Sequence, residues 1–262
     1  MDLNAMAPAA AEDAPLVRVT GASYVRGGYR SFEFADVFAR AGQVTVLLSG
    51  ERAFARDLLL AIAGAVRPTS GSLTVSDASF TASSGAGVLH AAAAWSGFQR
   101  RLRATGTVGL GVFTGLTEVD SALTVEEAVA RELGYRRGTN AETPDVLDFL
   151  AALGLATYAD QRVERLLPAA RARLSAALAL ASAPRVAVVD LRDSFCVGLT
   201  ADEEHAVVRE LRDIARTTGT AVMVSCSEAS SSMAADAVFA LDIAASEALA
   251  GVPRPCSEGA DV

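Results

Sequence analysis

Three short runs of apolar residues stand out in the hydrophobic pattern of the chain. Residues 44–48 (VTVLL), 185–190 (RVAVVD) and 221–225 (AVMVS) are rich in β-branched residues and nearly free of polar positions. Such runs predict strands that are buried on both faces. A segment with a helical apolar period separates the second run from the third, and strands that alternate with helices predict a parallel sheet. We therefore expect an α/β fold.

Local signals mark where the helices begin and end. Residues 53–63 are rich in helix formers and close on Gly64, which suits a helix C-terminus. Thr200 and Glu203 have the spacing of a capping box, and Gly219 is expected to end the helix that follows. The first strand, a turn and the first helix therefore follow one another directly.

The middle of the chain carries helix signals and no convincing strand between residues 123 and 181. Thr124 and Glu127 form a second capping box. The run TPD at 143–145 predicts Thr143 as an N-cap with Pro144 at the first helical position, and Gly154 is expected to end that helix. A helical insertion is thus predicted inside an α/β chain.

Composition and charge narrow the classes of function. Hydrophobic residues make up 51% of the 262, yet no window reaches the roughly 18 to 20 uncharged apolar residues of a spanning helix, so direct membrane insertion is not expected. The net charge of −8, from 31 acidic and 23 basic residues, argues against a nucleic-acid surface. Residues 1–14 and 251–262 are predicted to be flexible extensions.

All 23 basic residues are arginines, so the chain has no lysine. Cys196, Cys226 and Cys256 lie far apart without C-x-x-C spacing, which suggests neither a zinc site nor a disulfide framework and fits a reducing cytoplasm. The sequence has no G-x-S-x-G or H-E-x-x-H motif, and no catalytic residue is predicted.

The order of these segments resembles the nucleotide-binding domain of ABC transporters. The helix predicted over residues 53–63 ends in AIAG. The segments RPTSGSLTV, LTVEEAVARE and DVLDFLAALGLATYADQRV follow it, and a later strand ends in aspartate. The likeness covers residues 16–245. It implies a cassette over residues 15–250 with a P-loop NTPase-like core, a mainly parallel sheet, an N-terminal antiparallel β portion and a helical subdomain at about 115–167.

The phosphate loop of that family needs glycines, a lysine and a metal-binding hydroxyl, because backbone N–H groups must converge on phosphate. Without gaps, the resemblance sets Ser49 and Phe54 on two of the glycines, Ala55 on the lysine and Arg56 on the hydroxyl. A shift by one residue instead sets Gly50 on a glycine, Arg56 on the lysine and Asp57 on the hydroxyl. Arginine binds phosphate through its planar fork, whereas Asp57 would repel it.

Other motifs of the family are kept unevenly. Asp190, at the carboxyl end of its strand, matches the aspartate that binds Mg²⁺. Leu191 stands where the resemblance expects the catalytic glutamate, and Ser227 stands in the place of the switch histidine. Thr114 or Gly115 replaces the glutamine that contacts the metal.

The signature loop and the adenine-stacking position are also altered. Residues 167–170 (LPAA) replace the serine, the glycines and the glutamine of the signature, and Pro168 has no N–H to donate. Tyr24 or Tyr29 could stack on adenine. The predicted nucleotide-binding residues are therefore Gly50, Arg56, Asp57, Asp190, Tyr24 and Tyr29, with Asp190 also as the metal ligand.

The resemblance and its departures lead to three hypotheses. The first is a degenerate cassette subunit of a transport system, with weak binding of ATP and Mg²⁺ at most, peripheral to the cytoplasmic face of the membrane through a permease or paired with a second cassette. The second is a divergent active ATPase for export, with Arg56 in place of lysine. The third is a cytosolic scaffold that keeps only the fold.

Overall fold

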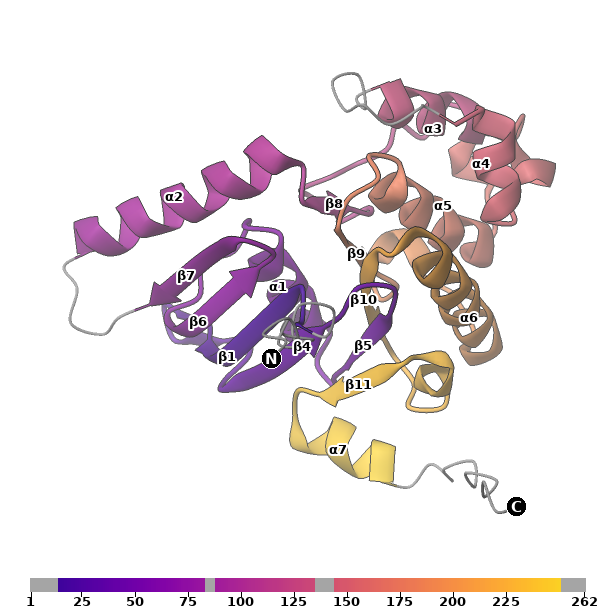
Figure 1. Ribbon diagram of the computed structural model, residues 1–262. Coiled ribbons are helices and arrows are strands. Elements are labelled where there is room, and N and C mark those ends of the chain that lie inside the picture. Colours follow the sequence, from indigo (N-terminus) through magenta and orange to yellow (C-terminus); the bar gives the residue numbers. More distant parts are fainter. Residues whose placement is uncertain (1–13, 83–87, 135–143, 251–262) are drawn as a thin grey trace, which may run out of the picture.

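The computed structural model describes residues 14–82, 88–134 and 144–250. An antiparallel sheet lies at the N-terminal side of the molecule (Figure 1), with strand order β4-β1-β6-β7. Its strands are β1 (Val17–Ser23), β4 (Ala35–Ala39), β6 (Ser70–Val75) and β7 (Ala78–Ala82). A two-stranded ribbon, β2 (Val25–Arg26) and β3 (Tyr29–Arg30), follows β1, and helix α2 (Val88–Thr105) packs on β7. The predicted N-terminal antiparallel portion is confirmed.

A parallel five-stranded sheet forms the centre of the fold, in the order β11-β5-β10-β9-β8. All three predicted strands are present in it, and every residue of each is buried. The strands are β5 (Val44–Leu48), β8 (Val108–Leu110), β9 (Val186–Asp190), β10 (Ala221–Cys226) and β11 (Ala237–Ala240). The predicted α/β class with a mainly parallel sheet is confirmed.

Alternate residues of the central strands point to opposite faces of the sheet and belong to two different hydrophobic cores. Val186 and Val188 of β9 face the core that contains helix α1 (Arg52–Ile62) and the antiparallel sheet, whereas Ala187 and Val189 face the core of helices α5 (Pro168–Leu180) and α6 (Ala201–Thr218). Because both faces are covered, the strands are apolar at every position, which explains their continuous apolar runs.

The helical region lies at the side of the molecule away from the antiparallel sheet (Figure 1). It contains α3 (Val125–Gly134), α4 (Val146–Ala152) and two 3₁₀ turns at Ala156–Tyr158 and Val163–Arg165. Between β9 and α7 (Ile243–Ala250), two further 3₁₀ turns lie at Ser194–Cys196 and Ser231–Ala234.

Both predicted capping boxes are present. Thr124 and Glu127 exchange hydrogen bonds at the start of α3, and Thr200 and Glu203 do so at the start of α6. Gly219 ends α6 in the left-handed conformation, with φ of 73°.

The predicted start of α4 is wrong by two residues. Asp145 is the N-cap, because its carboxylate accepts from the N–H groups of Leu147 and Asp148. Pro144 therefore precedes the cap instead of opening the helix, and Thr143 lies outside the described residues. A carboxylate caps a helix at least as well as a threonine hydroxyl, which is consistent with Asp145 as the N-cap.

Two glycines set the distance between β8 and α5. A Cβ atom on Gly109 would lie 1.9 Å from the carbonyl oxygen of Ala179, and one on Gly111 would lie 2.5 Å from the hydroxyl of Ser175. The GLG of residues 109–111 therefore serves close packing at a strand end. No helix among the described residues is long and apolar enough to cross a membrane. Of the predicted extensions at residues 1–14 and 251–262, all but Ala14 lie outside the described ranges.

Candidate functional site

The carboxyl ends of the parallel strands meet at one edge of the central sheet, and the segments that follow them form the candidate site. The first is the turn between β5 and α1. It contains only Ser49, Gly50 and Glu51, because β5 ends at Leu48 and α1 already begins at Arg52. A phosphate loop needs about six residues before its helix. The helix-forming run RAFARDLLLAI has instead extended α1 toward the strand.

The carboxylate of Asp242, which follows β11, binds this turn directly. Its Oδ2 accepts from the N–H of Gly50 at 2.8 Å and from the hydroxyl of Ser49 at 2.6 Å. Its Oδ1 accepts from the N–H of Ala245 at 2.8 Å, in the first turn of α7. Burial alone would raise the pKa of Asp242, but these hydrogen bonds lower it below its usual value. A carboxylate of the chain thus takes the N–H that a phosphate would need.

Helix α7 also contacts the turn. A Cβ atom on Gly50 would lie 3.4 Å from the Cβ of Ala244. Gly50 and Ala244 line two cavities, of about 430 and 590 Å³. A further cavity, of about 620 Å³, lies at the opposite edge of the sheet beside Phe149 and Ile214, so cavity volume does not single out this crevice.

Arg192, two residues after β9, fixes the other side of the turn. Its guanidinium donates to the carbonyl oxygens of Ser49 and Gly50. The backbone of the turn is therefore held by a carboxylate on an N–H group and by a cation on two carbonyl groups. Both contacts oppose a rearrangement that would point more N–H groups into the crevice.

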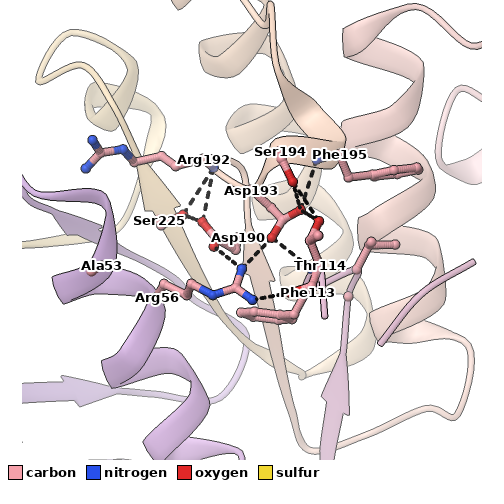
Figure 2. Close-up of polar contacts among 12 residues, drawn as sticks. Ala53, Arg56, Phe113, Thr114, Asp190, Arg192, Asp193, Ser194, Phe195 and Ser225 are labelled. Carbon is pink, nitrogen blue, oxygen red and sulfur yellow. Dashed lines mark hydrogen bonds and ion pairs between the residues drawn. The ribbon is translucent and has the colours of Figure 1, made fainter. Parts of the chain in front are cut away.

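The second part of the site is a cluster of charges around Arg56, drawn in Figure 2. One guanidinium nitrogen, Nη1, donates to Oδ2 of Asp193 and lies 3.5 Å from Oδ2 of Asp190. The other terminal nitrogen, Nη2, donates to the carbonyl oxygen of Thr114 at 2.7 Å. The ring of Phe113 lies 5.5 Å from the guanidinium carbon. The guanidinium thus sits among oxygen atoms rather than facing the turn.

Thr114 joins the loop after β8 to the segment after β9. Its N–H donates to Oδ2 of Asp193 at 3.0 Å, and its hydroxyl bonds both Asp193 and Ser194. The N–H of Phe195 completes the coordination of the Asp193 carboxylate at 2.9 Å. Thr114 is the residue that the resemblance set near the metal-contacting glutamine, and the structure places it beside Asp193.

The two aspartates of this cluster differ in acidity. Burial raises the pKa of Asp190, although a hydrogen bond from Ser225 and the charge of Arg56 counteract it. Burial also acts on Asp193, but hydrogen bonds from Thr114, Phe195 and Arg56 outweigh it and lower the pKa below its usual value. The two pKa values therefore move in opposite directions, because Asp193 has more hydrogen-bond donors around its carboxylate than Asp190 has.

The arrangement fits neither a bound Mg²⁺ nor the phosphates of ATP. Mg²⁺ requires free oxygen ligands, but the oxygens around Asp190 already surround a guanidinium cation. No group of three or more His, Cys, Asp or Glu side chains within residues 14–82, 88–134 and 144–250 could hold a metal ion. The phosphates would require N–H donors from a turn of three residues whose Gly50 N–H is bonded to Asp242.

The other predicted nucleotide-binding residues lie beside this cluster or further from it. Asp57 follows Arg56 directly and interacts with its charge, with Ser31 and with Tyr29, but burial outweighs these effects and raises the pKa of Asp57. Tyr29 is 48% exposed, whereas Tyr24 packs with its ring centroid 6.2 Å from that of Phe32. Of the predicted set, the structure brings Arg56 and Asp190 together and places Gly50 at the turn. Their role in nucleotide binding stays a prediction.

The positions where the resemblance expects catalytic groups have structural partners instead. Leu191 is buried in the core of α5 and α6. Ser227 donates its N–H, at 2.9 Å, and its hydroxyl to the carboxylate of Glu204, itself buried. Pro168 opens α5, after the exposed N-cap residue Leu167.

Three charged residues of the site, Arg192, Asp193 and Asp242, were not among the predicted site residues. Asp193 carries the strongest contacts of the charge cluster, and Asp242 binds the turn. Both follow the carboxyl ends of parallel strands, which is the signal that selected Asp190. That signal is weak for Asp242, because β11 is short and only partly buried.

The sequence matches no protein-family model, and no curated protein sequence is similar to it. Solved structures do resemble it. The protein cbiO1 from Clostridium perfringens, part of the ABC transporter complex cbiONQ, has a TM-score of 0.64 at 17% identity, covering 87% of this chain and 85% of that chain. The fold is that of an ATP-binding cassette.

Two further cassettes agree with this result. MJ1267, in its ADP conformation, has a TM-score of 0.63 at 13% identity over 91% of this chain and all of the other. A nucleotide-free cassette from an ABC transporter has a TM-score of 0.61 at 14% identity over 87% and 88% of the two chains. The cassette fold predicted from AIAG and RPTSGSLTV is confirmed, although these identities establish only the fold.

Proposed function

We propose that this chain is a cassette subunit of a membrane transport system that does not hydrolyse ATP and acts through its surfaces. One observation carries the proposal, namely the bond between the Asp242 carboxylate and the N–H of Gly50 in a three-residue turn. Phosphoryl transfer depends on positioning and charge stabilisation. A turn whose N–H group is occupied by an internal carboxylate offers neither to a phosphate.

The alternative of a divergent ATPase requires Arg56 to face the phosphates. Its guanidinium is bonded to Asp193 and to the carbonyl of Thr114, and its side chain is 22% exposed. Releasing it would leave the buried Asp190 without its neighbouring positive charge, which is costly. The positions of Leu191 and Ser227, each with structural partners, also favour the inactive reading.

Calorimetric titration of Mg·ATP into the purified protein, with a steady-state ATPase assay, tests the proposal. We expect no heat, no shift in melting temperature at millimolar ATP and no turnover above a buffer blank. Asp190→Ala serves as the comparison. Micromolar binding or steady turnover that this substitution abolishes would refute the proposal and revive the active alternative.

The partner of the subunit is proposed to be a permease or a second cassette, which would hold it at the cytoplasmic face of a membrane. Two exposed apolar side chains at the carboxyl edge support a protein contact there. Leu167 is 66% exposed and Val197 is 62% exposed. Their chain neighbours Pro168 and Gly198 are close, since a Cβ atom on Gly198 would lie 3.3 Å from Pro168. Exposed apolar groups that lie together often mark interaction surfaces.

Sedimentation equilibrium distinguishes pairing from a scaffold without a cassette partner. If the chain pairs through this edge, Leu167→Asp and Val197→Asp should each shift it toward monomer, whereas Leu147→Asp, half exposed in α4, should not. A wild-type protein that is monomeric at all concentrations would leave the permease as the proposed partner. A monomer that also fails to bind a co-expressed permease would favour the scaffold.

A further inference from the structure

We propose that Arg56 occupies a latent divalent-cation site, where its guanidinium supplies the positive charge that a metal ion would supply. The inference rests on the proposed function, because both require that the crevice forms without bound Mg·ATP. It starts from the atoms around the guanidinium. Oδ2 of Asp193, Oδ2 of Asp190 and the carbonyl oxygen of Thr114 converge on it from three places in the chain.

These donors have the chemistry of a hard-cation site. Carboxylate and carbonyl oxygens are the ligands that Mg²⁺, Mn²⁺ and Ca²⁺ select, and no sulfur or imidazole is among them. Arg56 contributes the only cation that the structure places against these three oxygens among the described residues. The nearby guanidinium of Arg192 is directed at the carbonyl groups of Ser49 and Gly50 instead.

An independent observation also points to a cation at this place. Asp190 is completely buried, and its Oδ2 atom accepts no hydrogen bond. The nitrogen of Arg56 lies 3.5 Å away, which is an ion-pair distance and too long for a good hydrogen bond. A buried carboxylate oxygen without a donor needs a nearby positive charge, and the geometry of this oxygen suits a cation placed where the guanidinium lies.

Arginine is well suited to hold such a place permanently. Its guanidinium stays protonated at every physiological pH and can donate to several oxygens from one plane. Nη1 donates to Asp193 and Nη2 donates to Thr114, so one side chain of α1 joins the segments that follow β8 and β9. The ring of Phe113 lies 5.5 Å from the guanidinium carbon and contributes a cation–π contact.

The test is to remove the guanidinium and offer a metal ion without any nucleotide. Arg56→Ser leaves the three oxygens and adds a hydroxyl. Arg52→Ser is the matched control, since Arg52 lies on the same helix, is exposed and has no hydrogen bond or ion pair with any other described residue. Binding of Mn²⁺ is measured by the loss of its free electron paramagnetic resonance signal, and melting temperature is measured with and without Mn²⁺.

We expect Arg56→Ser to bind about one Mn²⁺ per chain and to gain about 3 °C or more in melting temperature at saturating metal. Wild type and Arg52→Ser should show neither effect, and Arg56→Ser combined with Asp193→Asn should lose both. Absence of binding by a folded Arg56→Ser protein, or equal binding by wild type, would overturn the inference.

A folding defect in the variant would itself be informative. Arg56→Ser that is soluble only when Mn²⁺ is present supports the inference, whereas insolubility at every Mn²⁺ concentration overturns it. Arg56→Lys keeps a positive charge and should fold without a response to Mn²⁺. Because no nucleotide is present, failure of this inference can be told apart from failure of the proposed function, which the ATP titration tests.

Discussion

The Nη1 nitrogen of Arg56 lies 3.5 Å from Oδ2 of Asp190, a fully buried oxygen that accepts no hydrogen bond. Replacing Arg56 with alanine should therefore lower the free energy of unfolding by about 3–5 kcal/mol, because the substitution leaves a buried carboxylate uncompensated. Urea denaturation at pH 7 measures the change. Arg52→Ala should stay within about 0.5 kcal/mol of wild type. Equal losses in the two variants would mean that Arg56 acts only as a helix residue.

The contact between Asp242 and the turn should make stability depend on pH. The folded-state pKa of Asp242 is lowered, so its contribution is present above the unfolded-state pKa of about 3.9 and is lost as the pH falls through the lower, folded value. Asp242→Asn should cost about 1–2 kcal/mol at pH 7, and the difference from wild type should shrink below about pH 4. Urea denaturation at a series of pH values gives this profile.

The matched control for that experiment is Asp77→Asn. Asp77 is an exposed carboxylate in the turn between β6 and β7, and its side chain has no hydrogen bond or ion pair with another described residue. We expect no pH-dependent difference from wild type for this control. A difference between Asp242→Asn and wild type that stays constant down to pH 3 would show that the charge of Asp242 is irrelevant.

Replacing glycine with alanine should cost much more stability at the end of β8 than in the turn after β5. At Gly109, a new Cβ atom would lie 1.9 Å from a backbone oxygen of α5. Gly109→Ala should therefore cost about 3 kcal/mol or more, because backbone cannot move aside. At Gly50, the nearest atom would be at 3.4 Å and φ is not in the left-handed region, so Gly50→Ala should stay within about 0.5 kcal/mol of wild type. Thermal and urea unfolding of both variants measure these changes. Comparable losses at the two sites would contradict the difference in packing around these two glycines.

Restoring the missing glutamate should not restore hydrolysis. Leu191→Glu would place a carboxylate at a position that is 3% exposed, within the core of α5 and α6. We expect it to cost about 3 kcal/mol or more and to give no ATP turnover, because the phosphate-binding turn is still absent. Leu191→Met, which conserves volume, should cost less than about 1.5 kcal/mol. An active Leu191→Glu protein would show that only the glutamate had been lost.

The elements of the fold were predictable because their signals are local. The apolar run VTVLL requires burial on both faces wherever it lies, and the capping boxes at Thr124 and Thr200 use residues three positions apart. The start of α4 was misplaced because two good capping residues, Thr143 and Asp145, stand close together. Aspartate is the better N-cap of the two, but Pro144 suits the first helical position and so favoured Thr143 in the prediction.

The charges of the site were less predictable because their partners are remote in sequence. Asp242 binds Gly50 across 192 positions, and Arg56 meets Asp193 across 137. From the sequence alone, Arg56 could correspond either to the lysine or to the hydroxyl residue of the family's phosphate loop. The structure directs its guanidinium to Asp190 and Thr114, the residues that the resemblance associates with the metal.

The missing side chains at Gly109 and Gly111 also have a mechanical consequence. They let β8 lie directly on α5, and the chain reaches Thr114 three residues later, where Asp193 and Arg56 hold it. The root of the segment that leads to the helical region is therefore clamped to the central sheet. If a partner rotates the helical region, the pivot must lie beyond these contacts, and the hydrogen bonds between Phe113 and Thr117 extend the fixed part of the chain to Thr117.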